Sequence, residues 1–375
     1  MKFGLYQQGY VRSDARSGLD PLERVRQIIV EAQAAETYGL EYFGVSEQHF
    51  KFPTNSTGAI DTILSWVAAR TEKLRLTPSA VIPALAHPLA VAERWATIDV
   101  LSGGRLDFAV GRGNTPGTAN AFEVPIPETN DRTTEALEII LKAWSGQPFS
   151  HRGKYWQFDE VRVHPRPLQS PMPRISMASI SVGSCAQAGS RRLGLVATSN
   201  NVRWSQVHAR LNAYREAWET GTVFAGAIPC SNINLQVPIH VAKTSQLARE
   251  QVEFGVVEYA NRVMKQDLLN HRLTYGNDKG MDTTGEFYDN FQGLLDLTPL
   301  AVGSPQYCVE KLVRVHEEFN VDEITLHIDY ATHEQLMECI RLIGEEVIPE
   351  VRRLTKRPAL ALRLPTETLR AGHVS

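Results

Sequence analysis

The residues of this chain best suited to acid–base chemistry follow a short apolar run. Residues 40–45 form a strand-like segment, and Ser46-Glu47-Gln48-His49 come directly after it. His49 can gain or lose a proton near neutral pH, because the unperturbed imidazole pKa is about 6.5. Glu47 is the main carboxylate candidate beside it, whereas the Gln48 amide cannot transfer a proton. The group predicts proton transfer by His49, with packing behind Glu47 as the structural alternative.

Several other chemistries have weak support. The histidines are scattered and show no H-x-H or H-E-x-x-H spacing, so we expect no metal site. Carboxylates are too few after the strand-like runs for a paired-carboxylate glycosidase. The Gly-rich segment 111–117 lacks the Gly-Lys-Ser/Thr ending of a P-loop, and the first strand is not followed by a dinucleotide-binding glycine fingerprint.

The amino-acid composition limits which classes of molecule this protein is expected to bind. The 375 residues include 39 Lys+Arg and 42 Asp+Glu, for a formal charge of −3. This balance, without a long run of like charges, disfavours nucleic acid and anionic membranes as partners. The amino-terminal segment lacks a signal-peptide core and no apolar stretch is long enough to cross a membrane, so we expect a cytoplasmic protein.

The fold must bring the ends of several strands together. Strand-like runs occur at residues 2–6, 40–45, 74–83, 105–110, 174–178, 195–199, 233–242 and 323–328. Helical patterns occur at residues 21–38, 58–70, 88–101, 131–144, 183–193, 206–220, 244–265, 305–320 and 333–347. Because parallel strands need such crossover helices, the alternation predicts an α/β fold, a (β/α)8 TIM barrel, rather than an open doubly wound sheet.

Two segments break the alternation. Residues 145–173 are proline-rich, with two strand-like pieces at 154–158 and 161–163, and residues 266–300 are polar with no clear period. We expect both to be insertions in a single domain over residues 1–375, with a C-terminal tail at about 350–375.

A barrel places its active site at the carboxyl ends of its strands, which selects candidate residues. Besides residues 46–49, these positions hold Gln7 and Gln8, Thr77–Ala80, Gly111–Asn114, Ala178–Ser181 with Ser184, and Ser199–Asn201. The set is rich in hydrogen-bond donors and poor in carboxylates.

Four motifs resemble those of the bacterial luciferase-like flavin monooxygenases, in the same order and spacing. They are Ser46-Glu-Gln-His-Phe50, Ala86-His-Pro-Leu-Ala-Val-Ala-Glu93, Leu101-Ser-Gly-Gly-Arg-Leu106 and Val110-Gly-Arg-Gly113. The resemblance extends through Tyr155–Pro173 and Val302–Ile328, and so covers nearly the whole chain. The four motifs together are specific for the superfamily and much less so for the substrate.

The resemblance implies an enzyme that binds reduced FMN (FMNH2), supplied by a separate NAD(P)H:flavin reductase. With O2 the flavin would form a C4a-peroxide, and a small organic substrate would receive one oxygen atom. The resemblance also implies a homodimer that pairs through the second and third helices, whose outward positions would include Trp66, Val67, Trp95 and Ile98.

The resemblance also implies which residues touch the flavin ring. Pro78-Ser79-Ala80 matches a strand end where the family often has a non-prolyl cis peptide beside the ring. Gly111 and Arg112 match the strand end that lines the ring. Luciferase has a cysteine at the position of Gly111, which suggests a different substrate or peroxide lifetime here.

Phosphate contacts follow from the same resemblance. Arg132 corresponds to the family's phosphate-contacting arginine, with a solvent-exposed first-turn residue as the alternative. Ser179, Ser181 and Ser184 lie where backbone and hydroxyl donors approach the phosphate, at a helix amino terminus.

The main departure from the family concerns proton transfer. The family often has Glu-His-His after the second strand, where this chain has Glu47-Gln48-His49. We therefore expect His49 and Glu47 to be catalytic, and Gln48, His87 and Asn114 to contact substrate. His87 precedes a helix and could equally cap it or pack in the wall.

Two alternatives stay open. A deazaflavin-dependent oxidoreductase of the same superfamily would pass hydride without O2, although Gly111-Arg-Gly113 in place of Gly-Thr-Gly favours FMN. The other alternative is a non-catalytic flavin-binding homologue. The missing first histidine supports this alternative, whereas the chain length and the full set of polar strand ends oppose it.

Overall fold

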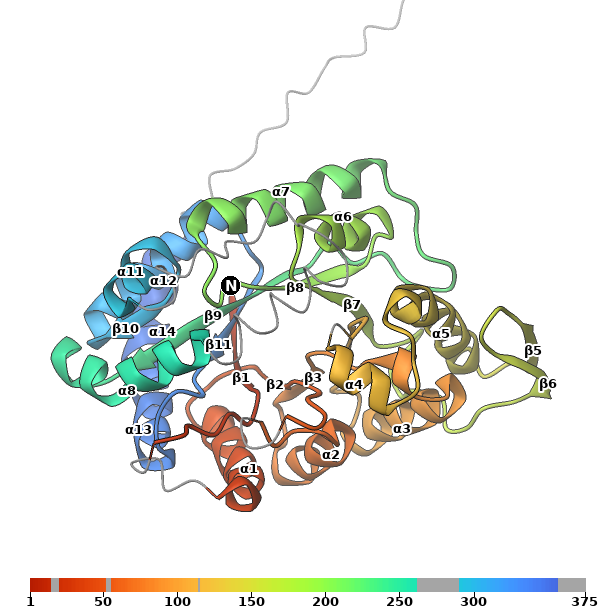
Figure 1. The fold of residues 1–375 in the computed structure, drawn as a ribbon, viewed down its shortest axis with the longest axis horizontal. Coiled ribbons are helices and arrows are strands. Elements are labelled where there is room, and N and C mark those ends of the chain that lie inside the picture. The colour runs from red at the N-terminus through yellow and green to blue at the C-terminus, as the bar shows by residue number, and fades with distance from the viewer. Residues whose placement is uncertain (15–19, 52–54, 114, 262–289, 357–375) are drawn as a thin grey trace, which may run out of the picture.

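The computed structural model describes residues 1–14, 20–51, 55–113, 115–261 and 290–356, and a parallel barrel lies at its centre (Figure 1). Its strands are β1 (Lys2–Gln7), β2 (Tyr42–Val45), β3 (Arg75–Pro78), β4 (Asp107–Val110), β7 (Arg174–Ser179), β8 (Gly194–Thr198), β9 (Ile233–Val241) and β11 (Glu323–His327). They pair in the order β3-β2-β1-β11-β9-β8-β7-β4. Parallel bridges from Leu76 to Leu106 and from Val81 to Val110 bring β3 beside β4. The predicted (β/α)8 barrel is confirmed.

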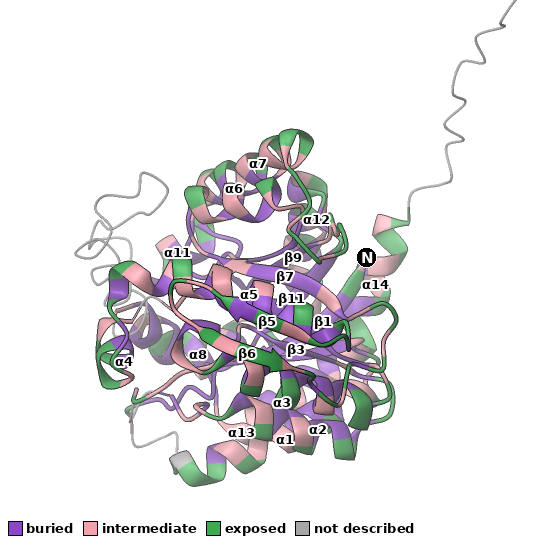
Figure 2. Ribbon diagram, turned by 90° about the vertical axis from the view of Figure 1, so that its right-hand side faces the viewer, coloured by how far each residue is buried: buried purple, intermediate pink, exposed green. Residues whose placement is uncertain are grey.

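Helices cover the outside of the barrel, and the strands inside them are almost entirely buried (Figure 2). The helices are α1 (Pro21–Thr37), α2 (Ile60–Arg70), α3 (Pro88–Leu101), α5 (Thr129–Trp144), α6 (Val182–Ser190), α7 (Trp204–Thr220), α8 (Ser245–Tyr259), α12 (Pro305–Phe319) and α13 (His333–Leu342). A π-helical turn, η4 (Ile343–Val347), joins α13 to α14 (Ile348–Thr355), so the predicted tail begins within a helix. Strands buried on both faces are expected of a parallel barrel, because helices cover its outer side.

The amino-terminal end of the barrel is filled by an ion-pair network. Arg174 pairs with Glu323 at 2.9 Å and with Asp107 at 3.0 Å, and Arg75 reaches Asp107 at 2.6 Å. These residues stand at the starts of β7, β11, β4 and β3. Because this end is filled by paired charges, the space for a ligand lies at the opposite, carboxyl end.

The first insertion forms a hairpin whose strands differ from the prediction. β5 (Phe149–Arg152) pairs antiparallel with β6 (Gln157–Val161), instead of the predicted pieces at 154–158 and 161–163. The reason is the Glu135 carboxylate on α5, which accepts hydrogen bonds from the backbone N–H groups of residues 154–156. That contact makes 154–156 the turn rather than a strand.

The remaining short elements lie in the loops. They are η1 (Pro83–Leu85), α4 (Pro116–Ala121), η2 (Ile126–Glu128), α11 (Phe291–Leu297) and β10 (Ala301–Gly303), which pairs with β9. α11 falls in the second insertion, where no period was expected, because a helix of this length spans too few turns to show one. Residues 266–289 of that insertion, and 357–375 of the tail, lie outside the described residues.

The prediction that Trp66, Val67, Trp95 and Ile98 point outward from α2 and α3 is wrong for three of the four residues. Trp66 is 55% exposed, but Val67, Trp95 and Ile98 are buried. Val67 continues the inward stripe of Ile60, Ile63 and Leu64 at helical spacing, so it faces the barrel.

Candidate functional site

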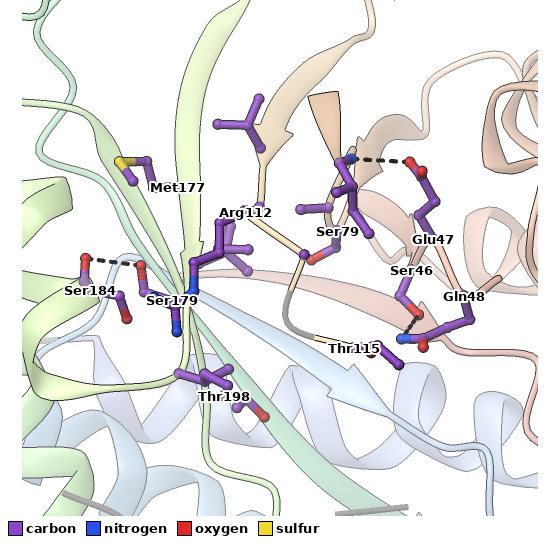
Figure 3. Close-up of a pocket in the computed structure, with 18 of the residues that line it drawn as sticks. Ser46, Glu47, Gln48, Ser79, Arg112, Thr115, Met177, Ser179, Ser184 and Thr198 are labelled. Carbon is purple, nitrogen blue, oxygen red and sulfur yellow. Dashed lines mark hydrogen bonds between the residues drawn. The ribbon is translucent and has the colours of Figure 1, made fainter. Parts of the chain in front are cut away.

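A cavity of about 230 Å³ opens at the carboxyl ends of the strands (Figure 3). Its wall is built from strand ends around the barrel: Tyr6 and Gln8 from the β1 end, Ser79 and Ala80 from β3, Met177 and Ser179 from β7, Thr198 and Asn200 from β8, and Gln236 from β9. Figure 3 shows Ser179 and Ser184 on one side, Ser46, Glu47 and Gln48 on the other, and Arg112 between them. Most of the predicted site residues are thus brought to one place.

The Glu47–His49 pair forms part of the cavity wall. His49 Nε2 lies 2.8 Å from Glu47 Oε1, and the Ile82 backbone N–H donates to Glu47 Oε2 at 3.1 Å. The His49 ring meets Phe122 edge-on at 4.9 Å between centroids. His49 is therefore held by a carboxylate while it still lines the cavity, a geometry that suits proton transfer.

Gln48 also lines the cavity, where its Nε2 donates to Ser46 Oγ at 3.2 Å. Its amide carries hydrogen-bonding groups into the wall between Ser46 and His49. It can orient a bound molecule but cannot exchange a proton with it.

The end of β3 has the backbone geometry that the resemblance implied. The peptide bond between Ser79 and Ala80 is cis, and Gln236 Nε2 donates to Ser79 Oγ at 3.0 Å. A Cβ atom at Gly111 would lie 3.2 Å from the Ala80 Cβ atom. The absence of a side chain at Gly111 therefore keeps a narrow space open beside Ala80.

A group of serine hydroxyl and backbone N–H groups lies at the start of α6. Ser181 is the N-cap and accepts from the Ser184 N–H at 3.2 Å, while Ser184 Oγ accepts from the Ser181 N–H at 3.1 Å. Ser179 Oγ donates to the Ser184 carbonyl at 3.2 Å. Ser179, Ser184 and Arg112 line the cavity, whereas Ser181 serves as the helix cap outside the lining.

Two further residues of the cavity lining were not identified from the sequence. Arg191 lines the cavity, and its Nη2 donates to Thr134 Oγ1 at 2.8 Å. Burial lowers the pKa of Arg191, but a guanidinium remains charged at neutral pH. Thr133 also lines the cavity, and its buried Oγ1 has no partner among the described residues. The signal was the spacing of Ser184, Gln187 and Arg191: the first two share one face of α6, and Arg191, its C-cap, follows at the same helical spacing.

Besides Ser181, two predicted residues described by the structure do not line the cavity. Arg132 donates from Nε to Glu128 at 2.9 Å and stacks over the Tyr155 ring at 4.5 Å, outside the lining. His87 is the exposed N-cap of α3, and its Nδ1 accepts from the Leu89 N–H at 3.3 Å. Asn114 lies outside the described residues.

The other half of the cavity is lined by neutral hydroxyl and amide groups, of which Tyr6 and Tyr259 were not predicted from the sequence. Tyr6 and Tyr259 line it, and both rings stand edge-on to the buried His327 ring, at 5.1 and 5.5 Å. Burial raises the pKa of Tyr6 to about 12, so its hydroxyl keeps its proton at neutral pH. Asn200 Nδ2 lies 2.7 Å from His327 Nδ1.

Neither metal binding nor membrane crossing has support in the described part of the chain. No group of three His, Cys, Asp or Glu side chains there is placed to hold a metal ion. No helix among the same residues is both long and apolar enough to cross a membrane.

Comparison with known proteins agrees with this architecture. A parallel barrel with a polar cavity at its carboxyl end defines the class of TIM-barrel enzymes. Residues 1–322 match the model of the luciferase-like monooxygenase family, and the chain belongs to that family.

Curated relatives share shorter stretches. An uncharacterized protein of Sinorhizobium fredii is 34% identical over 38% of this chain and 41% of its own length. An F420-dependent glucose-6-phosphate dehydrogenase of Kineococcus radiotolerans is 30% identical over 52% of this chain and 59% of its own length. An FMNH2-dependent dimethylsulfone monooxygenase of Pseudomonas putida is 34% identical over 38% of this chain and 40% of its own length. The matched region thus spans about half the length of these relatives, and the two whose cofactor is named use different ones, F420 and FMNH2.

Solved structures share the fold over almost the whole chain. The oxygenating constituent of 3,6-diketocamphane monooxygenase from Pseudomonas putida, solved with FMN, has a TM-score of 0.75 at 21% identity and covers 94% of this chain and 98% of that one. A monooxygenase from Streptomyces bottropensis has a TM-score of 0.74 at 24% identity, and the match covers 93% of this chain and 99% of that one. The predicted membership of the luciferase-like monooxygenase family is confirmed.

Proposed function

We propose that this protein is an FMNH2- and O2-dependent monooxygenase that acts on a small organic molecule. The observation that carries the proposal is the pairing of two features in one cavity. An anion-binding end at α6 lies in the same cavity as the narrow space that Gly111 leaves beside Ala80. A phosphate-bearing cofactor with a flat ring suits both features.

The residues present fit FMN by their chemistry. The start of α6 offers backbone donors for a phosphate, and the Ser179 and Ser184 hydroxyls would turn to it from the carbonyls that they now donate to. Arg112 and Arg191 add positive charge. The unpartnered Thr133 Oγ1 is a further buried donor at this end. We assign the phosphate contact to Arg191 in place of Arg132, because Arg191 lines the cavity and Arg132 is engaged by Glu128 and Tyr155.

Reduced FMN, when bound, supplies the reaction with O2 that transfers one oxygen atom to an organic molecule. The chain's own residues then have three tasks. His49, held by Glu47, gives or takes the proton that the oxygen transfer requires. Gln48 orients the organic molecule, and the apolar and neutral walls around Ala80 and Met177 limit the access of water.

The partners follow from the same proposal. The reduced cofactor would come from an NAD(P)H:flavin reductase, as the FMNH2 dependence of the Pseudomonas putida relative suggests. We propose a cytoplasmic homodimer, and Trp66 on α2 is an exposed apolar residue on the face expected to pair. We also propose that residues 1–375 act as one domain.

A deazaflavin-dependent oxidoreductase is the second candidate, because one relative is an F420-dependent dehydrogenase. Anaerobic titrations of the protein with FMNH2 and with reduced F420, followed by exposure to O2, separate the two. The proposal expects tighter binding of FMNH2 and flavin-dependent O2 uptake. Tight binding of F420 alone, or the absence of O2 uptake with bound FMNH2, would contradict it. Binding of FMN without reaction would favour the non-catalytic alternative.

A further inference from the structure

A second cavity lies behind the Glu47–His49 pair. Its volume is about 360 Å³, within the range of small-molecule sites. Most of its lining is apolar, and includes Ile60, Val81, Leu85, Val91, Trp95 and Phe122. It lies between the start of α2, the middle of α3 and the segment after β3.

The two cavities share one partition. Glu47, His49, Ile82 and Leu85 line both of them. The Glu47–His49 contact of 2.8 Å and the Ile82 N–H bond to Glu47 of 3.1 Å hold this partition together. A molecule in the second cavity therefore lies against the same imidazole that faces the first cavity.

The charges of the second cavity compensate one another. Asp61 and Arg94 form an ion pair at 3.1 Å, and their side chains are 21% and 51% exposed, so the pair lies toward solvent. The other polar lining residues, Glu47 and His49, are paired with each other. Among the described residues that line the cavity, no charge is left uncompensated. An ionised guest would therefore lose its hydration without gaining a partner there, whereas a neutral apolar guest would gain contacts.

We propose that this second cavity is a binding site for a neutral, largely apolar organic molecule, where the substrate docks before it reaches the cofactor cavity. The identity of the guest as substrate rests on the proposed function. The existence of the site rests only on the lining, the charges and the shared partition.

Bromobenzene is a suitable probe, because it is neutral, apolar and carries a heavy atom. Crystals of the full-length protein soaked in bromobenzene should show a bromine anomalous peak beside Trp95 and Phe122. In solution, tryptophan fluorescence should fall to a plateau as the bromobenzene concentration rises. Trp95→Phe should remove this saturable quenching. 4-Bromobenzoate, the ionised analogue, should bind at least tenfold more weakly.

A matched pair of variants tests the location. Ala59 is exposed and lines the second cavity, whereas Ala90 is exposed on α3 and does not line it. Ala59→Trp should weaken bromobenzene binding at least tenfold, and Ala90→Trp should change it less than twofold. FMN affinity should be the same in both variants.

The outcomes separate this proposal from the proposed function. A bromine peak only outside the second cavity, equal effects of the two variants, or equal binding of 4-bromobenzoate would overturn the site. Binding of xenon without bromobenzene would indicate a gas passage and would also overturn it. Bromobenzene binding in a protein that does not bind FMN would support the site and contradict the flavin-dependent function.

Discussion

At the residue scale, the proposed phosphate contact depends on which arginine reaches the cavity. Both Arg132 and Arg191 lie near the amino-terminal half of α5, but Arg132 stacks on Tyr155 while Arg191 bonds to Thr134 and lines the cavity. The two arginines differ because Arg132 contacts the β5–β6 hairpin and Arg191 extends from the end of α6. An alignment of motifs contains no information on such contacts.

Replacing Arg191 with alanine should weaken FMN binding by about 1–3 kcal/mol, because a charge-assisted hydrogen bond to the phosphate would be lost. Arg132→Ala is the matched control and should leave the affinity unchanged. Quenching of FMN fluorescence on titration with each variant measures both. A larger loss in Arg132→Ala would return the phosphate contact to Arg132.

Gly111 offers a second test at this scale. A Cβ atom there would lie 3.2 Å from the Ala80 Cβ atom, whereas one at Gly117 would meet nothing within 4 Å. Gly111→Val should therefore weaken FMN binding by about tenfold or more through overpacking, and Gly117→Val should not. Equal affinities in calorimetric titrations of the two variants would show that the space beside Ala80 does not hold the cofactor.

At the element scale, the starts of four strands are tied together by the ion pairs of Arg174 and Arg75 at the amino-terminal end of the barrel. Asp107 and Glu323 are almost fully buried. Asp107 lies beside Arg174 on the neighbouring strand β4, and Glu323 pairs with Arg174 from β11. The network positions β4, β7 and β11 without contacting the cavity, so it acts on stability rather than on the site.

Arg174→Met should lower the free energy of unfolding by about 3 kcal/mol, because it leaves the buried Glu323 carboxylate without its ion-pair partner, while Asp107 keeps only Arg75. Arg314→Met is the control: Arg314 is 50% exposed and pairs with Glu318 on the surface, so its loss should cost under about 1 kcal/mol. Urea unfolding of both variants gives the comparison. Similar losses in the two would show that the network contributes no more than a surface pair.

At the scale of the whole molecule, one buried histidine should make stability depend on pH. Burial of His240 in β9 lowers its pKa from 6.5 to about 4, although a hydrogen bond with Gln251 opposes the shift. The unfolded chain therefore binds a proton between pH 6.5 and 4 that the folded chain does not. The free energy of unfolding should fall by about 3 kcal/mol as the pH falls through this window.

Unfolding by urea at pH 7, 5.5 and 4.5 tests this expectation. His240→Asn should have a flatter dependence on pH than the unchanged protein, even if it is less stable at pH 7. His87→Asn, at an exposed helix cap, should keep the full dependence. An unchanged slope in His240→Asn would show that other groups cause the acid sensitivity.

The sequence alone determined the barrel and the region of the site. Apolar runs such as 40–45 and 233–242 alternate with helical patterns, and local hydrophobic periodicity is a property of the chain itself. Because parallel strands end at the same side of a barrel, Glu47, His49, Ser79, Gly111 and Ser179 could be grouped before their distances were known.

Only the tertiary structure decided how the side chains around that region pair. Arg191 reaches the cavity from α6, Glu135 sets the turn of the β5–β6 hairpin, and Val67 and Trp95 face inward. Each of these depends on contacts between residues far apart in the chain. Such contacts have no local pattern, since they are set by how helices pack on the barrel and not by the residues on either side.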